Sequence, residues 1–123
     1  MGKGLAMHEL PVIKSILGIC LKHAMSYGVK KILAIHLEIG ELSDLEDEWM
    51  QQYFDYVSKG TLAEGARLKI KKIPVVMQCN ACGESFEVDV KKMSEIRCPE
   101  CKADKNHELI SGREYYIKNM EAI

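Results

Sequence analysis

The chain has no long apolar run, no strong charge bias and few aromatic residues. No stretch approaches the roughly 18 consecutive apolar residues of a membrane span, and the N-terminus lacks the apolar core of a secretory signal. The net charge of −1 argues against a nucleic-acid binder, which usually carries a basic face. Internal repeats and low-complexity tracts are also missing. At 123 residues and 47% hydrophobic content, the chain can form one modest core and a small additional lobe.

Four of the five cysteines form two Cys-x2-Cys pairs, Cys79 with Cys82 and Cys98 with Cys101. Fifteen residues separate the pairs. This spacing is typical of a tetrahedral four-cysteine zinc site, in which each tight turn supplies two thiolates. We expect the intervening residues to form a hairpin that brings the two turns together. A closed site of this kind is structural and not catalytic.

Two other interpretations of the cysteine pairs fit less well. A redox dithiol explains one Cys-x2-Cys pair but not two at this spacing, and it would require a reactive thiol with a lowered pKa. Two disulfides require an oxidising compartment, and nothing in the sequence marks the chain as secreted. Reduced zinc thiolates agree with a cytoplasmic location.

Apolar spacing predicts a helix from Pro11 to Tyr27, with Gly28 as its C-terminal cap. The residues expected on its apolar stripe are Ile13, Ile16, Leu17, Cys20, Leu21, Ala24 and Met25. Cys20, the fifth cysteine, is therefore predicted to be a core residue. A strand is expected over 31–39, with its odd-numbered residues from Leu33 onward on one face. The residues expected on the opposite face are Ala34, His36 and Glu38.

A second helix is expected to begin at an N-cap, Ser43 or Asp44, and to end at Gly60. Its predicted apolar stripe consists of Leu45, Trp49, Tyr53, Tyr56 and Val57. Further strands are expected over 67–78, before the cysteine pairs, and over 113–121, after them. The last strand is too short to stand alone, so we expect it to pair with the first sheet. The order of elements then predicts an α+β fold, in which two helices pack on a small three-stranded sheet and a four-cysteine zinc-ribbon-like domain is inserted.

A Met-His-Glu tripeptide, Met7 to Glu9, precedes the first predicted helix. A His-Glu pair alone is usually a surface feature, and Glu9 has an ordinary role as an acid in a first helical turn. If translation begins at Met7, however, its α-amine, two backbone amide nitrogens and the His8 imidazole can surround one ion. Four nitrogens in a plane suit Ni(II) or Cu(II), whereas four thiolates suit zinc. We expect the three residues to be solvent-accessible, because an ion has to reach them and leave again.

Together these features resemble the HypA/HybF family of hydrogenase nickel-incorporation proteins, from Met7 to Ile123. The motifs that carry the resemblance are Met7-His8-Glu9-Leu10, Ile39-Gly40-Glu41-Leu42-Ser43, Gly60-Thr61-Leu62-Ala63-Glu64-Gly65-Ala66, Cys79-Asn80-Ala81-Cys82-Gly83, Cys98-Pro99-Glu100-Cys101 and Ser111-Gly112-Arg113-Glu114. The cysteine pairs alone occur in many families. Their combination with the other segments is much more specific.

The resemblance implies a nickel metallochaperone, and not an enzyme, that delivers Ni(II) to the precursor of the [NiFe]-hydrogenase large subunit. It implies a GTPase accessory protein as partner and, in some members of the family, a role in urease maturation. No membrane or nucleic acid is expected as a partner, and the protein is expected to be a monomer or a homodimer. The nickel ligands would be Met7, His8 and Glu9, and the structural zinc ligands would be Cys79, Cys82, Cys98 and Cys101. The implied domains are a nickel-binding domain over 7–76 plus 112–123 and a zinc-binding domain over 77–111.

The chain departs from the family pattern at two places. Six residues, 1–6, precede the methionine that begins the family's tripeptide, and we interpret them as a tag or an extended start. As written, this leader removes the free α-amine of Met7 as a ligand. Lys102 stands after the last cysteine, where glycine is common, and we expect only an adjustment of the turn.

Another class of function that fits the cysteine pairs is a zinc-ribbon adaptor that binds nucleic acid or a transcription protein. Its basic face would consist of Lys69, Lys71, Lys72, Lys91 and Lys92. Such a face usually interleaves aromatic residues with its lysines, and only Phe86 lies near them in sequence. This interpretation therefore ranks below the nickel metallochaperone.

Overall fold

The computed structural model describes residues 9–43 and 45–123, without the side chains of residues 93–95. The elements in chain order are α2 (Glu9–Ser26), β1 (Ile32–Gly40), the 3-10 helix η1 (Glu41–Ser43), α3 (Asp47–Val57), β2 (Arg67–Ile73), β3 (Val75–Cys79), β4 (Ser85–Val88), the 3-10 helix η2 (Val90–Glu95), β5 (His107–Ser111) and β6 (Tyr115–Ala122). They form two compact units. One takes in Leu45–Lys71, Tyr116–Ile123 and the described part of Met1–Leu37, and the other takes in Glu38–Asp44 and Lys72–Tyr115. None of the helices described is long and apolar enough to cross a membrane.

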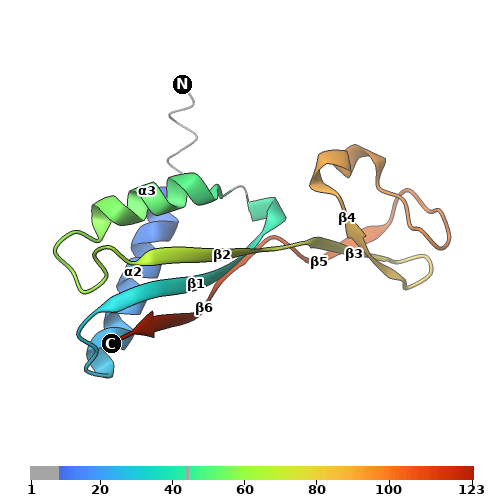
Figure 1. The fold of residues 1–123 in the computed structure, drawn as a ribbon. Helices are drawn as coiled ribbons and strands as arrows, with labels where there is room; N and C mark the ends of the chain where they lie inside the picture. The colour runs from blue at the N-terminus through green and yellow to red at the C-terminus, as the bar shows by residue number, and fades with distance from the viewer. Residues whose placement is uncertain (1–8, 44) are drawn as a thin grey trace. The chain divides into compact units, whose positions relative to one another are not determined.

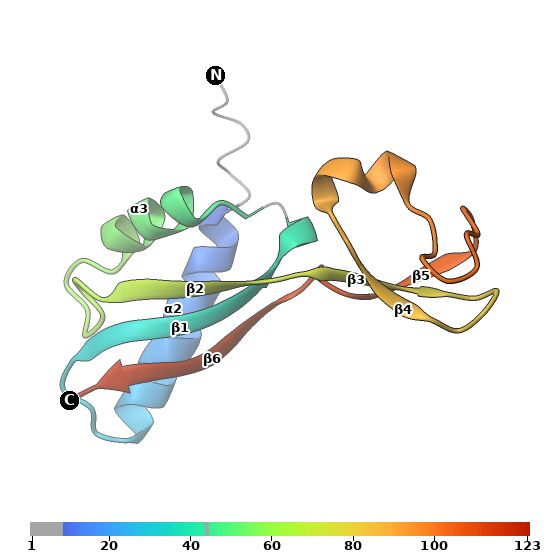
Figure 2. The same cartoon turned by 45° about the vertical axis from the view of Figure 1, so that its right-hand side comes forward.

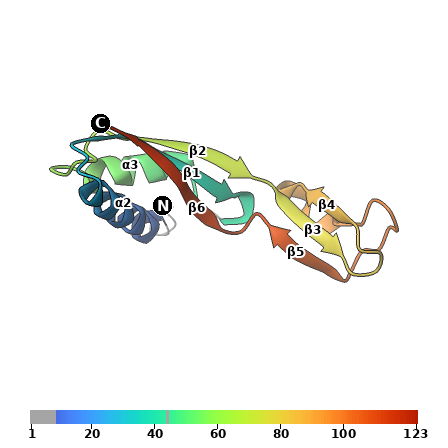
Figure 3. The same cartoon turned by 90° about the horizontal axis from the view of Figure 1, so that it is seen from below.

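The first sheet has three strands in the order β2-β1-β6, so the strand that follows the cysteine pairs does return to it (Figure 1). The backbone of Ile123 exchanges hydrogen bonds with that of Lys31, which ties the end of the chain to the start of β1. Figure 3 shows α2 and α3 on the same side of this sheet. The predicted α+β fold of two helices on a three-stranded sheet is therefore confirmed.

Helix α2 buries the apolar stripe that the sequence predicts. Ile13, Ile16, Leu17, Cys20 and Ala24 are all buried, whereas Met25 at the end of the expected stripe is 74% exposed. Gly28 has φ +68, and the amide of the next residue, Val29, donates to the carbonyl of Ala24. This is the expected glycine cap, because a residue with a Cβ is strained at positive φ. The helix begins at Glu9, two residues before the predicted start.

Helix α3 differs from the prediction in its cap and in its buried face. Its N-cap is Glu46, whose own side chain makes no capping hydrogen bond. Its buried residues are Met50 and Phe54, one position beyond the predicted Trp49 and Tyr53. Leu45 is buried as predicted, just before the helix. The prediction favoured the larger rings, but one step along a helix turns a side chain by about 100° and so changes the face that is buried.

The strands also differ in detail from the prediction. On the predicted apolar face of β1, Leu33 is 40% exposed, but Ile35, Leu37 and Ile39 are buried. Ile32 and Ala34 on the opposite face are buried as well, so both faces of β1 are largely covered. The single strand expected over 67–78 is two strands, interrupted at Pro74, which has no amide hydrogen for a sheet ladder. Strand β5 was not predicted.

The second sheet has the order β4-β3-β5 (Figure 2), and Cys79 is the last residue of β3. β3 pairs antiparallel with β4, from Val75 opposite Val88 to Gln78 opposite Ser85. The first cysteine turn is thus itself the hairpin loop. The residues between the pairs form β4 and η2, not the hairpin that the sequence predicts. The second neighbour of β3 is instead β5, which follows both cysteine pairs in the sequence.

Two glycines allow three backbone segments of this second unit to approach closely. A Cβ on Gly112, which has φ +105, would lie 2.6 Å from the Cα of Val75. A Cβ on Gly40 would overlap the carbonyl of Gly112. The amide of Leu42 donates to that same carbonyl at 2.7 Å. Two of the motifs shared with the family thus have a structural reason, which is backbone packing.

Candidate metal centre

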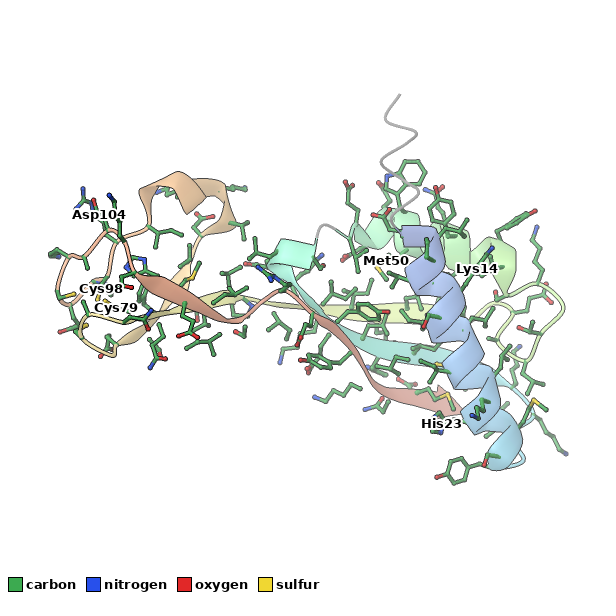
Figure 4. The ribbon with its side chains drawn as sticks, turned by 180° about the vertical axis from the view of Figure 1, so that it is seen from behind. Lys14, His23, Met50, Cys79, Cys98 and Asp104 are labelled. Atoms are coloured by element: carbon green, nitrogen blue, oxygen red, sulfur yellow. The ribbon has the colours of Figure 1, made fainter. Side chains whose placement is uncertain are left out.

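The four paired cysteines converge on one point. Their Sγ atoms all lie within 4.8 Å of one another. Cys79 Sγ is 3.6 Å from Cys101 Sγ, and Cys82 Sγ is 3.5 Å from Cys98 Sγ. A tetrahedron with zinc–sulfur bonds of about 2.3 Å has sulfur–sulfur edges of about 3.8 Å, whereas a disulfide requires about 2.05 Å. The cluster therefore has the donors and the spacing to hold one tetrahedral metal ion, and Figure 4 shows Cys79 and Cys98 side by side.

The two cysteine turns share one hydrogen-bonding scheme. In the first, the amide of Gly83 donates to the carbonyl of Cys79 at 2.7 Å, and in the second, the amide of Lys102 donates to that of Cys98 at 2.9 Å. Gly83 has φ +83 and Lys102 has φ +65. Lys102 thus occupies the left-handed conformation that glycine adopts without strain. The departure from the family pattern leaves the turn intact and places a strained residue in it.

The thiols of the cluster differ in acidity. The amide of Cys101, 3.5 Å from Cys98 Sγ, stabilises the thiolate and lowers the pKa of Cys98 to about 7. At Cys82 the amide of Glu84 lowers the pKa, but the neighbouring Cys98 thiol and burial outweigh it, and the pKa rises to about 12. Thiolates are the form that binds a metal, so a cation that displaces the remaining protons stabilises the whole cluster.

His107 supports the second cysteine turn from outside the cluster. Its Nε2 donates to the carbonyl of Ala103 at 3.0 Å, and the amide of Cys98 donates to the same carbonyl at 2.9 Å. The imidazole also packs edge-on against Phe86, with ring centroids 5.3 Å apart. His107 lies opposite Cys79 in the β3–β5 register. The sequence does not point to His107, because the two apolar residues of β5, Leu109 and Ile110, are adjacent and hide the alternation of the strand.

Cys20 lies apart from this cluster, in the core. It is 2% exposed, and burial raises the pKa of its thiol to about 11. A thiol that remains protonated is unreactive, so Cys20 is a packing residue, as predicted.

The Met-His-Glu tripeptide is described only at its last residue, since Met7, His8 and the leader 1–6 lie outside the described residues, as does Asp44. The Glu9 side chain is 2% exposed, so the expectation that it is solvent-accessible is wrong. Its Oε2 accepts a hydrogen bond from the amide of Glu46 at 2.9 Å. The Glu9 carboxylate thus accepts from the backbone amide of the α3 N-cap residue, the bond that a Glu at the third helical position makes in a capping box. The other oxygen, Oε1, is buried and has no hydrogen-bond partner among the described residues.

A family model described as "Hydrogenase/urease nickel incorporation, metallochaperone, hypA" matches residues 7–122. The chain belongs to the HypA family. This family comprises nickel metallochaperones for hydrogenase maturation.

Relatives of similar length support this assignment. The hydrogenase maturation factor HypA of Lawsonia intracellularis is 34% identical over 94% of this chain and 98% of its own length. The protein of the same name from Geobacter metallireducens is 36% identical over the same shares. The solution structure of the nickel metallochaperone HypA from Helicobacter pylori aligns with a TM-score of 0.64 and 23% identity, over 94% of this chain and 97% of that one. A second solution structure of a HypA protein aligns at 0.70 and 24% identity, over 95% and 97%. These two structures show a shared fold.

Proposed function

We propose that this protein carries Ni(II) to the precursor of the [NiFe]-hydrogenase large subunit, beside a GTPase accessory protein in the cytoplasm. The observation that carries the proposal is the family match over residues 7–122, which starts at the methionine of the Met-His-Glu tripeptide. The family description also names urease, and delivery to urease maturation belongs to the same proposal. The protein acts by binding and release of an ion and performs no chemical step.

Nickel is held, in this proposal, by Met7 and His8 together with the backbone amide of Glu9. The first amides of a helix have no intrahelical acceptor, so the Glu9 nitrogen at the start of α2 is not committed to the helix. The Glu9 carboxylate, by contrast, is occupied by the amide of Glu46. Its buried Oε1 has no partner within the described part of the chain, which is costly for a buried polar atom, and a cation bound beside it would relieve that cost. The carboxylate therefore positions the site and favours a cation, while the backbone supplies the ligand.

Zinc is the metal that the four cysteines would hold, as a structural ion. Four thiolates satisfy its four-coordinate preference and leave no open position for chemistry. When bound, zinc supplies folding free energy to the turns that hold it. The proposed domains are 7–76 plus 112–123 for nickel and 77–111 for zinc, so the two ions are separated by donor type as well as by position.

The competing adaptor function has less support. One of its five lysines, Lys69, is 3.3 Å from Glu121, whose Oε2 also lies 2.6 Å from His36 Nε2. The three side chains come from three neighbouring strands of the first sheet. Lys69 therefore belongs to a charge-paired sheet surface and is not an isolated basic contact.

The proposal is tested by replacing His8 with alanine in a chain that begins at Met7. Loss of the imidazole removes a direct ligand, so nickel affinity by calorimetry should fall by roughly tenfold or more. The matched control is His23→Ala, which removes an exposed imidazole from the last turn of α2. Zinc content should stay unchanged in both variants, because the cysteines share no ligand with His8. Equal nickel affinity in the wild-type protein and His8→Ala would refute the nickel site.

A further inference from the structure

Three aromatic side chains of α3, Trp49, Tyr53 and Tyr56, form a stripe on its surface, called here the aromatic stripe. Their spacing of i, i+4 and i+7 places them along one face of the helix. The core-facing positions are taken by Met50 and Phe54, which are fully buried. Trp49 and Tyr56 remain 39% and 72% exposed. The stripe therefore presents large apolar surface that the core of this unit does not use.

The rings of the stripe make specific contacts with one another and with a neighbouring lysine. Trp49 and Tyr53 stack with centroids 6.0 Å apart and an interplanar angle of 26°. The Nζ of Lys59 lies 5.8 Å from the centroid of the Tyr56 ring. Tyr56 thus already receives a cation on its face, which is the interaction that exposed aromatic rings offer to lysine and arginine. Exposed aromatic surface with a polar rim is typical of protein-binding sites, where tryptophan and tyrosine contribute most of the affinity.

Charge selects the kind of partner. The sequence of α3 contains three acidic residues, Asp47, Glu48 and Asp55, and no basic one. Glu46, at the N-cap, adds a further exposed carboxylate one turn before Trp49. The stripe therefore combines ring faces with a negative rim, and both attract cations.

We propose that the aromatic stripe is the docking surface for a basic amphipathic segment of a partner protein, with aliphatic groups on the rings and lysine or arginine on the acidic rim. This proposal adds a partner-binding surface to the proposed nickel carrier, and it rests on the proposed function for the identity of the ion that is carried. The hydrogen bond from the Glu46 amide to Glu9 fixes the start of α3 against the residue that follows His8. Trp49 lies three residues further on, so a partner bound to the stripe lies near Glu9, the residue of the Met-His-Glu tripeptide that the structure describes.

The test uses the single tryptophan of the chain as its reporter. A 14-residue helical peptide of leucine and lysine, without aromatic residues, is titrated into the zinc-loaded full chain, and a peptide with glutamate in place of lysine serves as the charge control. The lysine peptide should shift and quench Trp49 fluorescence in a saturable manner, and the glutamate peptide should not. Tyr56→Ser and the double variant Glu46→Gln/Glu48→Gln should each weaken binding about fivefold or more. Tyr27→Ser, which removes a tyrosine that is 79% exposed on the helix end away from the stripe, should bind as the wild type does.

Several outcomes overturn the proposal. The first three are no fluorescence change at millimolar peptide, equal binding of both peptides, and equal weakening of binding by Tyr27→Ser and Tyr56→Ser. The fourth is a change in Trp49 emission on self-association without peptide, which would assign the stripe to a second copy of the chain. Nickel calorimetry on Tyr56→Ser, begun at Met7, separates this proposal from the proposed function. Unchanged nickel affinity with weakened peptide binding supports docking, whereas a wild-type protein that binds the peptide but no nickel refutes only the nickel carrier.

Discussion

Individual residues of the cysteine cluster divide into the four proposed metal ligands and the residues that hold the turns in place. The carbonyl of Ala103 accepts from both Cys98 and His107, so the second turn is anchored at one atom from two sides. A thiolate that has to be positioned by the protein binds less tightly when its turn is released. We therefore expect the metal affinity to depend on His107, although His107 is not one of the proposed ligands.

A graded series of variants tests this division. Cys98→Ser should lose zinc, because it removes one of four thiolates, and should melt 77–111 while most helix content in far-UV circular dichroism remains.

His107→Phe keeps a ring against Phe86 but loses the donor to Ala103. The loss of one hydrogen bond of about 1 kcal/mol should speed zinc release to a chelator about fivefold. Glu108→Gln, at the exposed neighbouring position, should have the wild-type rate. Full zinc retention by Cys98→Ser would exclude the assigned ligand set, and an unchanged rate in His107→Phe would exclude the anchoring role.

The sequence identifies the four cysteines that the structure brings together, but not the residues that position them. Two Cys-x2-Cys pairs at a fixed spacing indicate a metal site directly, since few other kinds of site contain them. His107 has no such pattern, because its function depends on a carbonyl that the fold brings to it. The same holds for Glu9, whose carboxylate caps a helix 37 positions along the chain. Contacts between distant segments leave no periodic trace in a sequence.

Elements were predicted more securely than their faces and ends. The order of helices and strands around the first sheet was correct, because each has a clear apolar period. The face of α3 was not, since Trp49 and Met50 are adjacent and both apolar. The segment with Gly60, Thr61 and Glu64 is also explained only by structure, where the Glu64 carboxylate accepts from the Gly60 amide and the Thr61 hydroxyl donates to the carbonyl of Ser58. These local hydrogen bonds shape the loop between α3 and β2.

The backbone crossing at Gly112 gives a prediction at the scale of elements. Gly112→Ala places a methyl group 2.6 Å from the Cα of Val75 and forces alanine to φ +105. Overpacking and backbone strain together should lower the free energy of unfolding by about 3 kcal/mol, measured by urea unfolding of the zinc-loaded chain. Gly18→Ala is the matched control, since a Cβ there meets nothing within 4 Å. It should raise stability by about 0.5–1 kcal/mol, as alanine does in a helix. An equal or opposite ranking of the two variants would show that the segments do not meet closely at Gly112.

At the scale of the whole molecule, the proposed function requires two metal sites with different donors in one short chain. Thiolates in a closed tetrahedron retain their ion, while nitrogen ligands at the beginning of a helix can exchange theirs. A carrier needs both properties, because its own fold has to persist while its cargo leaves. The aromatic stripe, if it binds a partner as proposed, adds a third functional element to the same chain.

The residues before Met7 provide the decisive test of how nickel is held. In the full chain the nitrogen of Met7 is a peptide amide, whose lone pair is delocalised and which donates only after losing a proton, whereas in a chain that begins at Met7 it is a basic amine. The shorter chain should therefore bind nickel more tightly and give the absorption band of a diamagnetic square-planar ion, while the full chain binds more weakly and lacks that band. Both forms should contain one zinc, because the cysteines are common to them, and this serves as the internal control for folding. Affinity and d–d absorption are compared at one pH. Identical affinity and the same square-planar band in both forms would mean that the amine is dispensable, and that the coordination implied by the family does not apply to this chain.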